Sequence, residues 1–144
     1  MLNTDPVKYD SEGGTVIIKF SDTKTDTQGE RPLVLKRIIN QNHTDSVSLT
    51  WVTLFGRHEK VVNEISDRVY YIIDGEADFE LDYVIDDGMI FHEQGSVTGG
   101  DVVLIPKGVP YVFEGHMTYV VLNSPGYVPD SDRVVPGGFS PLAR

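Results

Sequence analysis

Polar and apolar residues alternate with a period of two along most of this sequence. No window of helical length has apolar residues at three- and four-residue spacing. The segment Ala77–Ile85 (ADFELDYVI) shows the alternation cleanly, and it ends at the turn signal Asp86-Asp87-Gly88. Similar segments follow one another at intervals of roughly ten residues. Many short strands with turns between them are typical of a β-sandwich or a closed barrel, so the sequence predicts an all-β fold.

The expected strands are short because turn residues are frequent, with 14 Gly and 8 Pro in the chain. The polar residues 21–31 predict a loop, and the proline-containing residues 126–144 predict an extended tail. A length of 144 residues corresponds to one domain, over residues 1–144, with a barrel core over about residues 33–125. The expected strands are Thr15–Phe20, Leu33–Ile39, Ser46–Phe55, Val69–Ile73, Ala77–Ile85, Met89–Phe91, Asp101–Ile105, Tyr111–Phe113 and Met117–Asn123.

Charge and composition exclude several classes of function. The formal net charge of −10 repels phosphate backbones and anionic lipids, so we expect neither a nucleic-acid nor a membrane partner. The longest apolar runs are about five residues, too short for a membrane span of about 20. The first ten residues have no apolar stretch, which predicts no secretory signal. The absence of cysteine excludes thiolate and disulfide chemistry and is consistent with a cytoplasmic protein.

Two glycine-containing turns carry a resemblance to a known family. The segment Gly100–Tyr111 (GDVVLIPKGVPY) is similar to the second motif of the cupin superfamily, G-x5-P-x-G-x2-H. The segment Arg68–Gly75 (RVYYIIDG) resembles the end of the first motif, E-x6-G, and a single hairpin separates the two. The resemblance covers Ser46–Pro125. It implies a jelly-roll β-barrel with an internal pocket for a small molecule, and a homodimer in which an N-terminal strand crosses the partner.

The positions that hold a metal ion in many cupins differ in this chain. The glutamate position is Arg68, and the second-motif histidine is Tyr111. The two first-motif histidines fall on Val61 and Asn63, or with a shorter spacing on Val62 and Glu64. An arginine donates hydrogen bonds only and is always charged, so it repels a divalent cation. We therefore expect no metal and no other cofactor.

A second alignment keeps a metal-dependent alternative open. If the first motif is shifted, His58, Lys60 and Glu64 occupy the ligand positions, although this needs an insertion before Tyr70 and gives one position to a lysine. First-row metals prefer imidazole, carboxylate or thiolate ligands to an ammonium group. This alternative corresponds to a dioxygenase or lyase with atypical ligands.

Strand alternation places Arg68 and Tyr70 on the same face of their strand. The family resemblance implies that this face points into the barrel, and the same reasoning turns Tyr111 and Phe113 inward. A buried arginine needs a partner, because an unpaired buried charge costs several kcal/mol. One partner is a ligand carboxylate or phosphate held by a bidentate pair of hydrogen bonds. The alternative is an internal salt bridge with one of four acids, Glu64, Asp67, Asp78 or Glu80.

Eight residues are candidates for the site. Tyr111 and His58 are the candidates for proton transfer, because phenol and imidazole groups exchange protons in catalysis. The candidates for substrate binding are Arg68, Tyr70, Trp51, Phe113, Asn63 and Tyr119. Core packing explains the aromatic residues equally well, and a solvated loop position explains His58.

These residues predict a metal-independent enzyme that transfers protons on a small anionic or sugar-like metabolite. The resemblance implies isomerase, epimerase or lyase chemistry, with Arg68 stabilising the negative charge that develops on an enol-type oxygen. The alternative from a different class is a sensor or carrier that binds a metabolite without turning it over.

Overall fold

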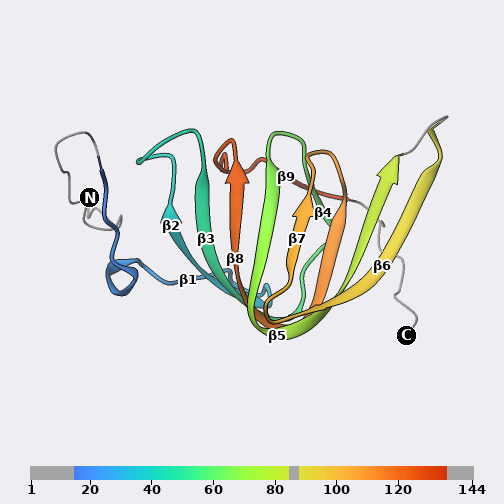
Figure 1. The fold of residues 1–144 in the computed structure, drawn as a ribbon, viewed down its shortest axis with the longest axis horizontal. Helices are drawn as coiled ribbons and strands as arrows, with labels where there is room; N and C mark the ends of the chain where they lie inside the picture. The colour runs from blue at the N-terminus through green and yellow to red at the C-terminus, as the bar shows by residue number, and fades with distance from the viewer. Residues whose placement is uncertain (1–14, 85–87, 136–144) are drawn as a thin grey trace.

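The structure is a computed structural model, and it describes residues 15–84 and 88–135. These residues form one curled sheet, and a 3-10 turn, η1 (Phe20–Asp22), precedes its first strand (Figure 1). The all-β prediction is confirmed. The strands are β1 (Asp26–Thr27), β2 (Leu33–Ile39), β3 (Ser48–Arg57), β4 (Val61–Asn63), β5 (Asp67–Val84), β6 (Ile90–Thr98), β7 (Val102–Ile105), β8 (Tyr111–Ser124) and β9 (Asp132–Val134).

All pairings are antiparallel, and the order β1-β2-β3-β8-β4-β9 forms one path through the sheet. Strand β5 joins this path through β8 and also pairs with β6 and β7. Figure 1 shows the strands side by side around a curved sheet, with the β5–β6 hairpin extending from one side. The curvature directs one face of the sheet inward, and this face holds the apolar core.

Strand β5 continues through residues Asp74-Gly75, where the sequence predicts a turn. A bulge between Ile72 and Asp74 lets the strand change direction while keeping its pairing with β8. Gly75 has φ +89°, and a Cβ at this position would lie 2.2 Å from the carbonyl oxygen of His116. The two expected strands Val69–Ile73 and Ala77–Ile85 are therefore one strand, and Ile85 lies outside the described residues.

Strand β8 likewise joins two segments that we expected to be separate, Tyr111–Phe113 and Met117–Asn123. The expected strand Met89–Phe91 is the start of the longer β6. The prediction of a strand over Thr15–Phe20 is wrong, because residues 15–19 have no regular structure and Phe20 begins η1. The aromatic ring of Phe20 packs edge-on against Trp51, with centroids 5.4 Å apart.

The tail folds back onto the barrel. Strand β9 pairs with β4, with Val62 opposite Arg133, while residues 136–144 lie outside the described part of the chain. Asp132 is thereby held beside the open end of the sheet. This contact joins residues about 70 positions apart, and it completes the site described below.

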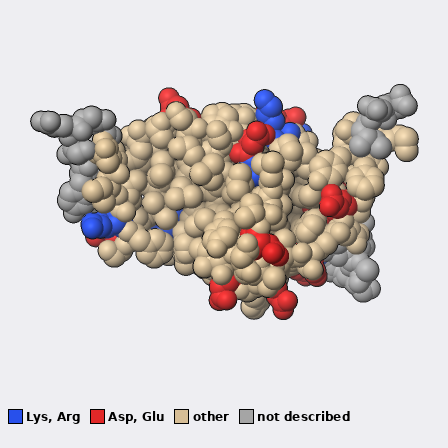
Figure 2. All heavy atoms as spheres, in the orientation of Figure 1, with Lys and Arg blue, Asp and Glu red and all other residues tan. Residues whose placement is uncertain are grey.

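The surface in Figure 2 is largely uncharged, with acidic side chains along its lower edge and at one side. Within the described ranges, no helix is long and apolar enough to span a membrane. Several large apolar side chains are also exposed on the outer face of β5 and β7, among them Tyr71 and Leu104.

Candidate functional site

A cavity of about 130 Å³ opens between the inner face of β2, β3 and β8 and the folded-back tail. One part of its wall is aliphatic, formed by Leu33, Leu35, Val52, Val61 and Val121. The remaining wall is polar and rich in tyrosine and arginine. Its charged and phenolic side chains are Arg31, Arg37, Arg68, Tyr70, Tyr111, Tyr119, Tyr127 and Asp132.

Three buried side chains in this wall form a continuous chain of hydrogen bonds. Arg68 donates from Nη1 to the hydroxyl oxygen of Tyr111 over 2.5 Å. The hydroxyl groups of Tyr111 and Tyr70 lie 2.6 Å apart, with either as donor. All three residues are at most 6% exposed. Charge-assisted hydrogen bonds shielded from water are strong and hold their groups in fixed positions.

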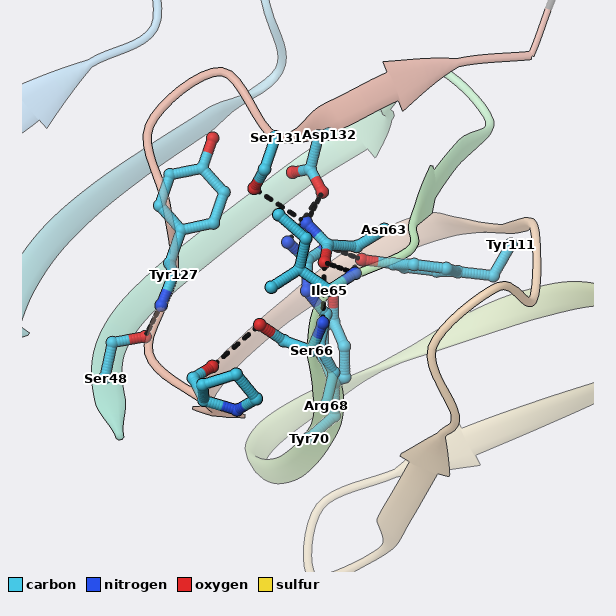
Figure 3. Close-up of polar contacts among 11 residues, drawn as sticks. Ser48, Asn63, Ile65, Ser66, Arg68, Tyr70, Tyr111, Tyr127, Ser131 and Asp132 are labelled. Atoms are coloured by element: carbon cyan, nitrogen blue, oxygen red, sulfur yellow. Dashed lines mark hydrogen bonds and ion pairs between the residues drawn. The ribbon is translucent and has the colours of Figure 1, made fainter. Parts of the chain in front are cut away.

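The guanidinium of Arg68 also pairs with the tail. Its Nη2 donates to Oδ1 of Asp132 over 2.6 Å, and the rings of Tyr111 and Tyr127 flank it, with centroids 5.9 and 5.8 Å away (Figure 3). The internal partner is thus Asp132, and none of the four acids Glu64, Asp67, Asp78 and Glu80 pairs with Arg68. Strand alternation could not have identified Asp132 as the partner, because this residue lies in the C-terminal tail.

Burial determines the protonation of the phenols. It raises the pKa of Tyr111, although the adjacent Arg68 acts in the opposite direction. Burial also raises the pKa of Tyr70 and of Tyr119. For Arg68, burial alone would lower the pKa, but the neighbouring Tyr111, Tyr70 and Asp132 more than compensate and raise it. At neutral pH the cavity therefore presents neutral phenols as hydrogen-bond donors next to a permanent cation.

His58 is buried, contrary to the prediction of a solvated loop position, and both of its ring nitrogens are engaged by the backbone. Nδ1 lies 2.7 Å from the carbonyl oxygen of Glu59, and Nε2 accepts the N–H of Phe113 at 3.0 Å. Burial lowers the pKa of His58 to about 4, so the ring is neutral at pH 7. A ring held in this way has no nitrogen free to accept a proton from a ligand, which removes the reason for assigning it to proton transfer.

Asn63 fixes the tail and does not line the cavity. Its Nδ2 donates to Ser131 Oγ and Asp132 Oδ1 at 2.9 and 3.0 Å (Figure 3). Its Oδ1 accepts the N–H groups of Ile65 and Ser66 at 3.0 and 2.9 Å. Because this side chain uses its amide nitrogen and oxygen to hold the loop and β9, it positions Asp132 and has no free group for a ligand.

The other aromatic candidates divide between the two faces of the sheet. Tyr119 is buried and lines the cavity. Phe113 is fully buried but lies in the core, with its ring centroid 5.0 Å from that of Tyr70. Trp51 faces outward, because its neighbours Thr50 and Val52 line the cavity and a strand alternates. The prediction that Trp51 and Phe113 line the pocket is therefore not supported by their positions.

Among the charged residues of the cavity wall, the sequence reasoning missed Arg31, Arg37 and Asp132. Arg37 could have been found, since it follows Leu33 and Leu35 at alternate positions on the inner face of β2. Arg31 lies in a turn and Asp132 lies in the tail, where no periodicity identifies an inner face.

No protein-family model matches the sequence, and no curated protein matches it either. Among solved structures, a variant of Streptomyces Pac13 with uridine superposes with a TM-score of 0.66 and 18% identity, covering 81% of this chain and 87% of that one. Pac13 is described as a β-barrel and a unique nucleoside dehydratase. Oxalate decarboxylase from Bacillus subtilis matches with a TM-score of 0.68 and 18% identity over 92% of this chain, which spans 34% of that protein.

The chain has the cupin fold. This confirms the jelly-roll prediction, and at these identities the likeness concerns the fold alone.

The residues at the metal positions of the cupin motifs do not fit a metal ion. Val61, Arg68 and Tyr111 occupy the positions that hold ligands in the cupin motifs, and they line the cavity with a hydrocarbon, a cation and a neutral phenol. Among the described residues, no group of three or more His, Asp or Glu side chains is arranged to hold a metal.

The shifted alignment does not provide a metal site either. His58 is bonded to the backbone, and the Nζ of Lys60 pairs with Asp82 at 2.5 Å. Glu64 is exposed and accepts a hydrogen bond from Arg133. The three side chains have different partners, and one of them is a cation, so they do not form a common ligand set.

Proposed function

We propose that this cupin is an enzyme that transfers protons on a small anionic or sugar-like metabolite bound in the cavity, without a metal ion. The observation that carries the proposal is the buried chain Arg68–Tyr111–Tyr70 in the cavity wall. Burying a cation and two hydroxyl groups is costly unless they are paired, and here they bond to one another and to Asp132, which holds them in fixed positions in the cavity wall. Such pre-arranged donors stabilise an oxygen that becomes negative during a reaction.

In this mechanism Tyr111 is the acid and Asp132 is the base. The carboxylate of Asp132 takes a proton from a substrate carbon, and the electron pair moves toward the neighbouring carbon. Tyr111 gives its phenolic proton to a leaving hydroxyl group in an elimination, or to the enol-type oxygen in an isomerisation. The resulting phenolate is stabilised by Arg68, whose Nη1 lies 2.5 Å away, and by the hydroxyl of Tyr70.

The structural neighbours support this class of reaction. Dehydration is an elimination of water, and Pac13 is described as a nucleoside dehydratase and was solved with uridine. A nucleoside is a sugar derivative, so nucleosides belong among the first compounds to test. The reaction type, elimination or isomerisation, follows from the product that is found.

An untargeted exchange experiment tests the proposal without knowledge of the substrate. The protein is incubated with a pool of small metabolites in D₂O, and mass spectrometry searches for compounds that gain deuterium or lose water. We expect at least one such compound with the unmodified protein, and a rate at least 100-fold lower with Tyr111→Phe. The rate falls because phenylalanine keeps the ring but removes the transferable proton.

Tyr83→Phe is the matched control. Tyr83 is a half-buried tyrosine in β5 that does not line the cavity, so its substitution also removes one hydroxyl group but should leave the exchange rate unchanged. Equal exchange in Tyr111→Phe and the unmodified protein would contradict the assignment of Tyr111.

A non-catalytic binding protein is the second candidate, and one observation favours it. Both nitrogens of His58 are bonded, and burial raises the pKa of Tyr70, Tyr111 and Tyr119. The buried wall therefore holds no group that is half-protonated at neutral pH. This candidate predicts a metabolite that binds but shows no exchange in the same experiment.

The homodimer expected from the family resemblance remains a proposal, supported by an apolar outer face. Tyr71, Ile73, Val102, Leu104 and Leu122 lie on neighbouring strands and are 37–61% exposed. A face of this kind can pair with its own copy about a two-fold axis. We expect a dimer by light scattering, and a monomer after Leu104→Lys. A monomeric unmodified protein would contradict this proposal.

A further inference from the structure

The charges that line the cavity do not cancel among the described residues. Arg68 is paired with Asp132, and Arg37 forms an ion pair with Asp26. The third arginine of the wall, Arg31, has no carboxylate within 4 Å in the described part of the chain. The wall therefore carries one uncompensated positive charge, on a protein whose net charge is −10.

The position of Arg31 is built by the turn before β2. Its backbone N–H bonds to the carbonyl oxygen of Gln28 at 3.0 Å, and its Nη1 donates to Oε1 of Gln28 at 3.2 Å. Gln28 is held in turn by Asp26, to which its Nε2 donates at 3.0 Å. The guanidinium is thus oriented by a neutral amide, which leaves its charge available.

The charge of Arg31 acts on the interior of the barrel. It is among the causes that lower the pKa of His58, after burial, and it opposes the effect of burial on the pKa of Tyr119. Both of these side chains are buried and line the cavity. Arg31 itself is exposed and lies at the wall, so it faces both the solvent and the ligand space.

We infer that Arg31 is the anion-binding residue of the cavity and that the ligand carries one carboxylate group. Arg68 remains paired with Asp132 and acts on the reacting oxygen, while Arg31 binds the charged end of the ligand. One free charge fits a carboxylate better than a phosphate ester, which carries close to two negative charges at pH 7. The inference rests on the proposed function for the claim that the cavity binds a metabolite.

Lactate and its neutral analogue lactamide test this inference, because they differ mainly in charge. Binding is followed by changes in the backbone amide NMR signals of Leu33, Tyr70 and Tyr111. We expect saturable binding of lactate in the millimolar range, weaker binding of inorganic phosphate, and little binding of lactamide. The variant Arg31→Gln should bind lactate about tenfold more weakly, the loss expected for one charge-assisted hydrogen bond. Arg31→Lys should retain part of the affinity.

The control is Arg133→Gln, which removes an exposed arginine that pairs with Glu64 and does not line the cavity. It should leave lactate binding unchanged. Equal binding of lactate and lactamide, no saturable lactate binding, or an unchanged affinity in Arg31→Gln would each overturn the inference. If lactate binds through Arg31 but no metabolite exchanges deuterium, the proposed catalysis fails and the anion site stands. If a neutral metabolite exchanges deuterium and lactate does not bind, the anion site fails and the proposed catalysis stands.

Discussion

Strand β5 carries two groups of buried charge, one on each side of its bulge. Before the bulge, Arg68 is joined to two phenols and to Asp132, with contacts of 2.5–2.6 Å. After the bulge, Glu80 and Asp82 belong to a second group, which they form with Lys60 and His92. Both groups place charges where water has little access, yet only the first lines the cavity.

The second group binds the β5–β6 hairpin to the segment before β4. The Nζ of Lys60 pairs with Oδ2 of Asp82 at 2.5 Å, and His92 Nδ1 lies 2.6 Å from Oδ1 of the same carboxylate. His92 Nε2 is 3.0 Å from Oε1 of Glu80. This last contact lacks hydrogen-bond geometry, and neither oxygen of the fully buried Glu80 has a hydrogen-bond partner among the described residues.

The difference between the two groups shows what distinguishes a site from a structural ion pair. Ion pairs that only hold elements together also shift pKa values, so a shifted pKa alone does not identify a site. Burial raises the pKa of Glu80; for Asp82 burial acts in the same direction, but Lys60 and His92 outweigh it and lower the pKa. The Arg68 group combines shifted pKa values with a cavity, and we assign function to it for that reason.

The largest effect is expected from Arg68→Met. This variant should lower the deuterium-exchange rate by about 100- to 1000-fold, because it removes the cation that stabilises the Tyr111 phenolate. The free energy of unfolding should fall by only about 1–2 kcal/mol, since Asp132 is partly exposed and can be solvated. Exchange rates and urea denaturation provide the two readouts. A large loss of stability with unchanged exchange would assign Arg68 to the same structural class as Lys60.

Acid should destabilise the protein through His58. Its pKa falls from 6.5 to about 4 on folding, a change of about 2.5 units, so only the unfolded state gains a proton between these values. The free energy of unfolding should therefore decrease by about 3 kcal/mol as the pH falls from 6.5 to 4. Chemical denaturation at several pH values measures this slope.

His58→Gln is the variant that isolates this effect. Glutamine can keep one donor and one acceptor but does not titrate, so most of the slope between pH 6.5 and 4 should disappear. A second decrease in the free energy of unfolding should remain in the variant as the pH falls below 3.8. It comes from Asp82, because the pKa of that carboxyl is lowered in the folded state. An unchanged slope above pH 4 would contradict the burial of a neutral His58.

Lys60→Met, unlike Arg68→Met, should lower the stability of the protein without lowering its deuterium-exchange rate. It leaves His92 as the only ionic partner of Asp82 among the described residues, so we expect the free energy of unfolding to fall by about 2 kcal/mol. This is less than for a deeply buried pair because Asp82 is 22% exposed. Deuterium exchange should stay within twofold of the unmodified protein. A large loss of exchange in a folded variant would mean that the second group also acts on the ligand.

Glu80→Gln should have the smallest effect, with a change in the free energy of unfolding below about 1 kcal/mol at pH 7. The pKa of Glu80 is raised by folding, so its ionised form destabilises the native state, and stability declines as the pH rises from 4.5 through the raised value. The glutamine variant should lack this decline. Comparing the pH dependence of urea denaturation in the two proteins tests it, and an identical decline would show that Glu80 does not cause it.

The inner face of β5 and β8 could be predicted from the sequence. Alternation placed Arg68 and Tyr70 on one face of their strand, and the resemblance to the cupin motifs predicted that this face and Tyr111 point into the barrel. Alternation along β3 turns Trp51 outward when the phase is taken from Val52, which lines the cavity.

The remainder of the site depends on tertiary contacts that periodicity does not encode. Asp132 reaches Arg68 because Asn63 anchors the tail, and both facts depend on pairing between β4 and β9. The buried ring of His58 is bonded through Nδ1 to the carbonyl oxygen of the adjacent Glu59 and through Nε2 to the backbone N–H of Phe113 in β8. Asp74-Gly75, directly after the bulge, has the local sequence of a turn, and only the pairing with β8 shows that the strand continues.

The most direct test of the central claim compares one hydroxyl from the first group with one carboxyl from the second. Deuterium exchange is measured in Tyr70→Phe and in Glu80→Gln, under conditions where circular dichroism shows that both are folded. The proposed function predicts that Tyr70→Phe loses at least tenfold in rate, because the phenolate of Tyr111 loses a hydrogen-bond donor, and that Glu80→Gln keeps the rate of the unmodified protein. Equal rates in Tyr70→Phe and the unmodified protein, with a loss in Glu80→Gln, would contradict it.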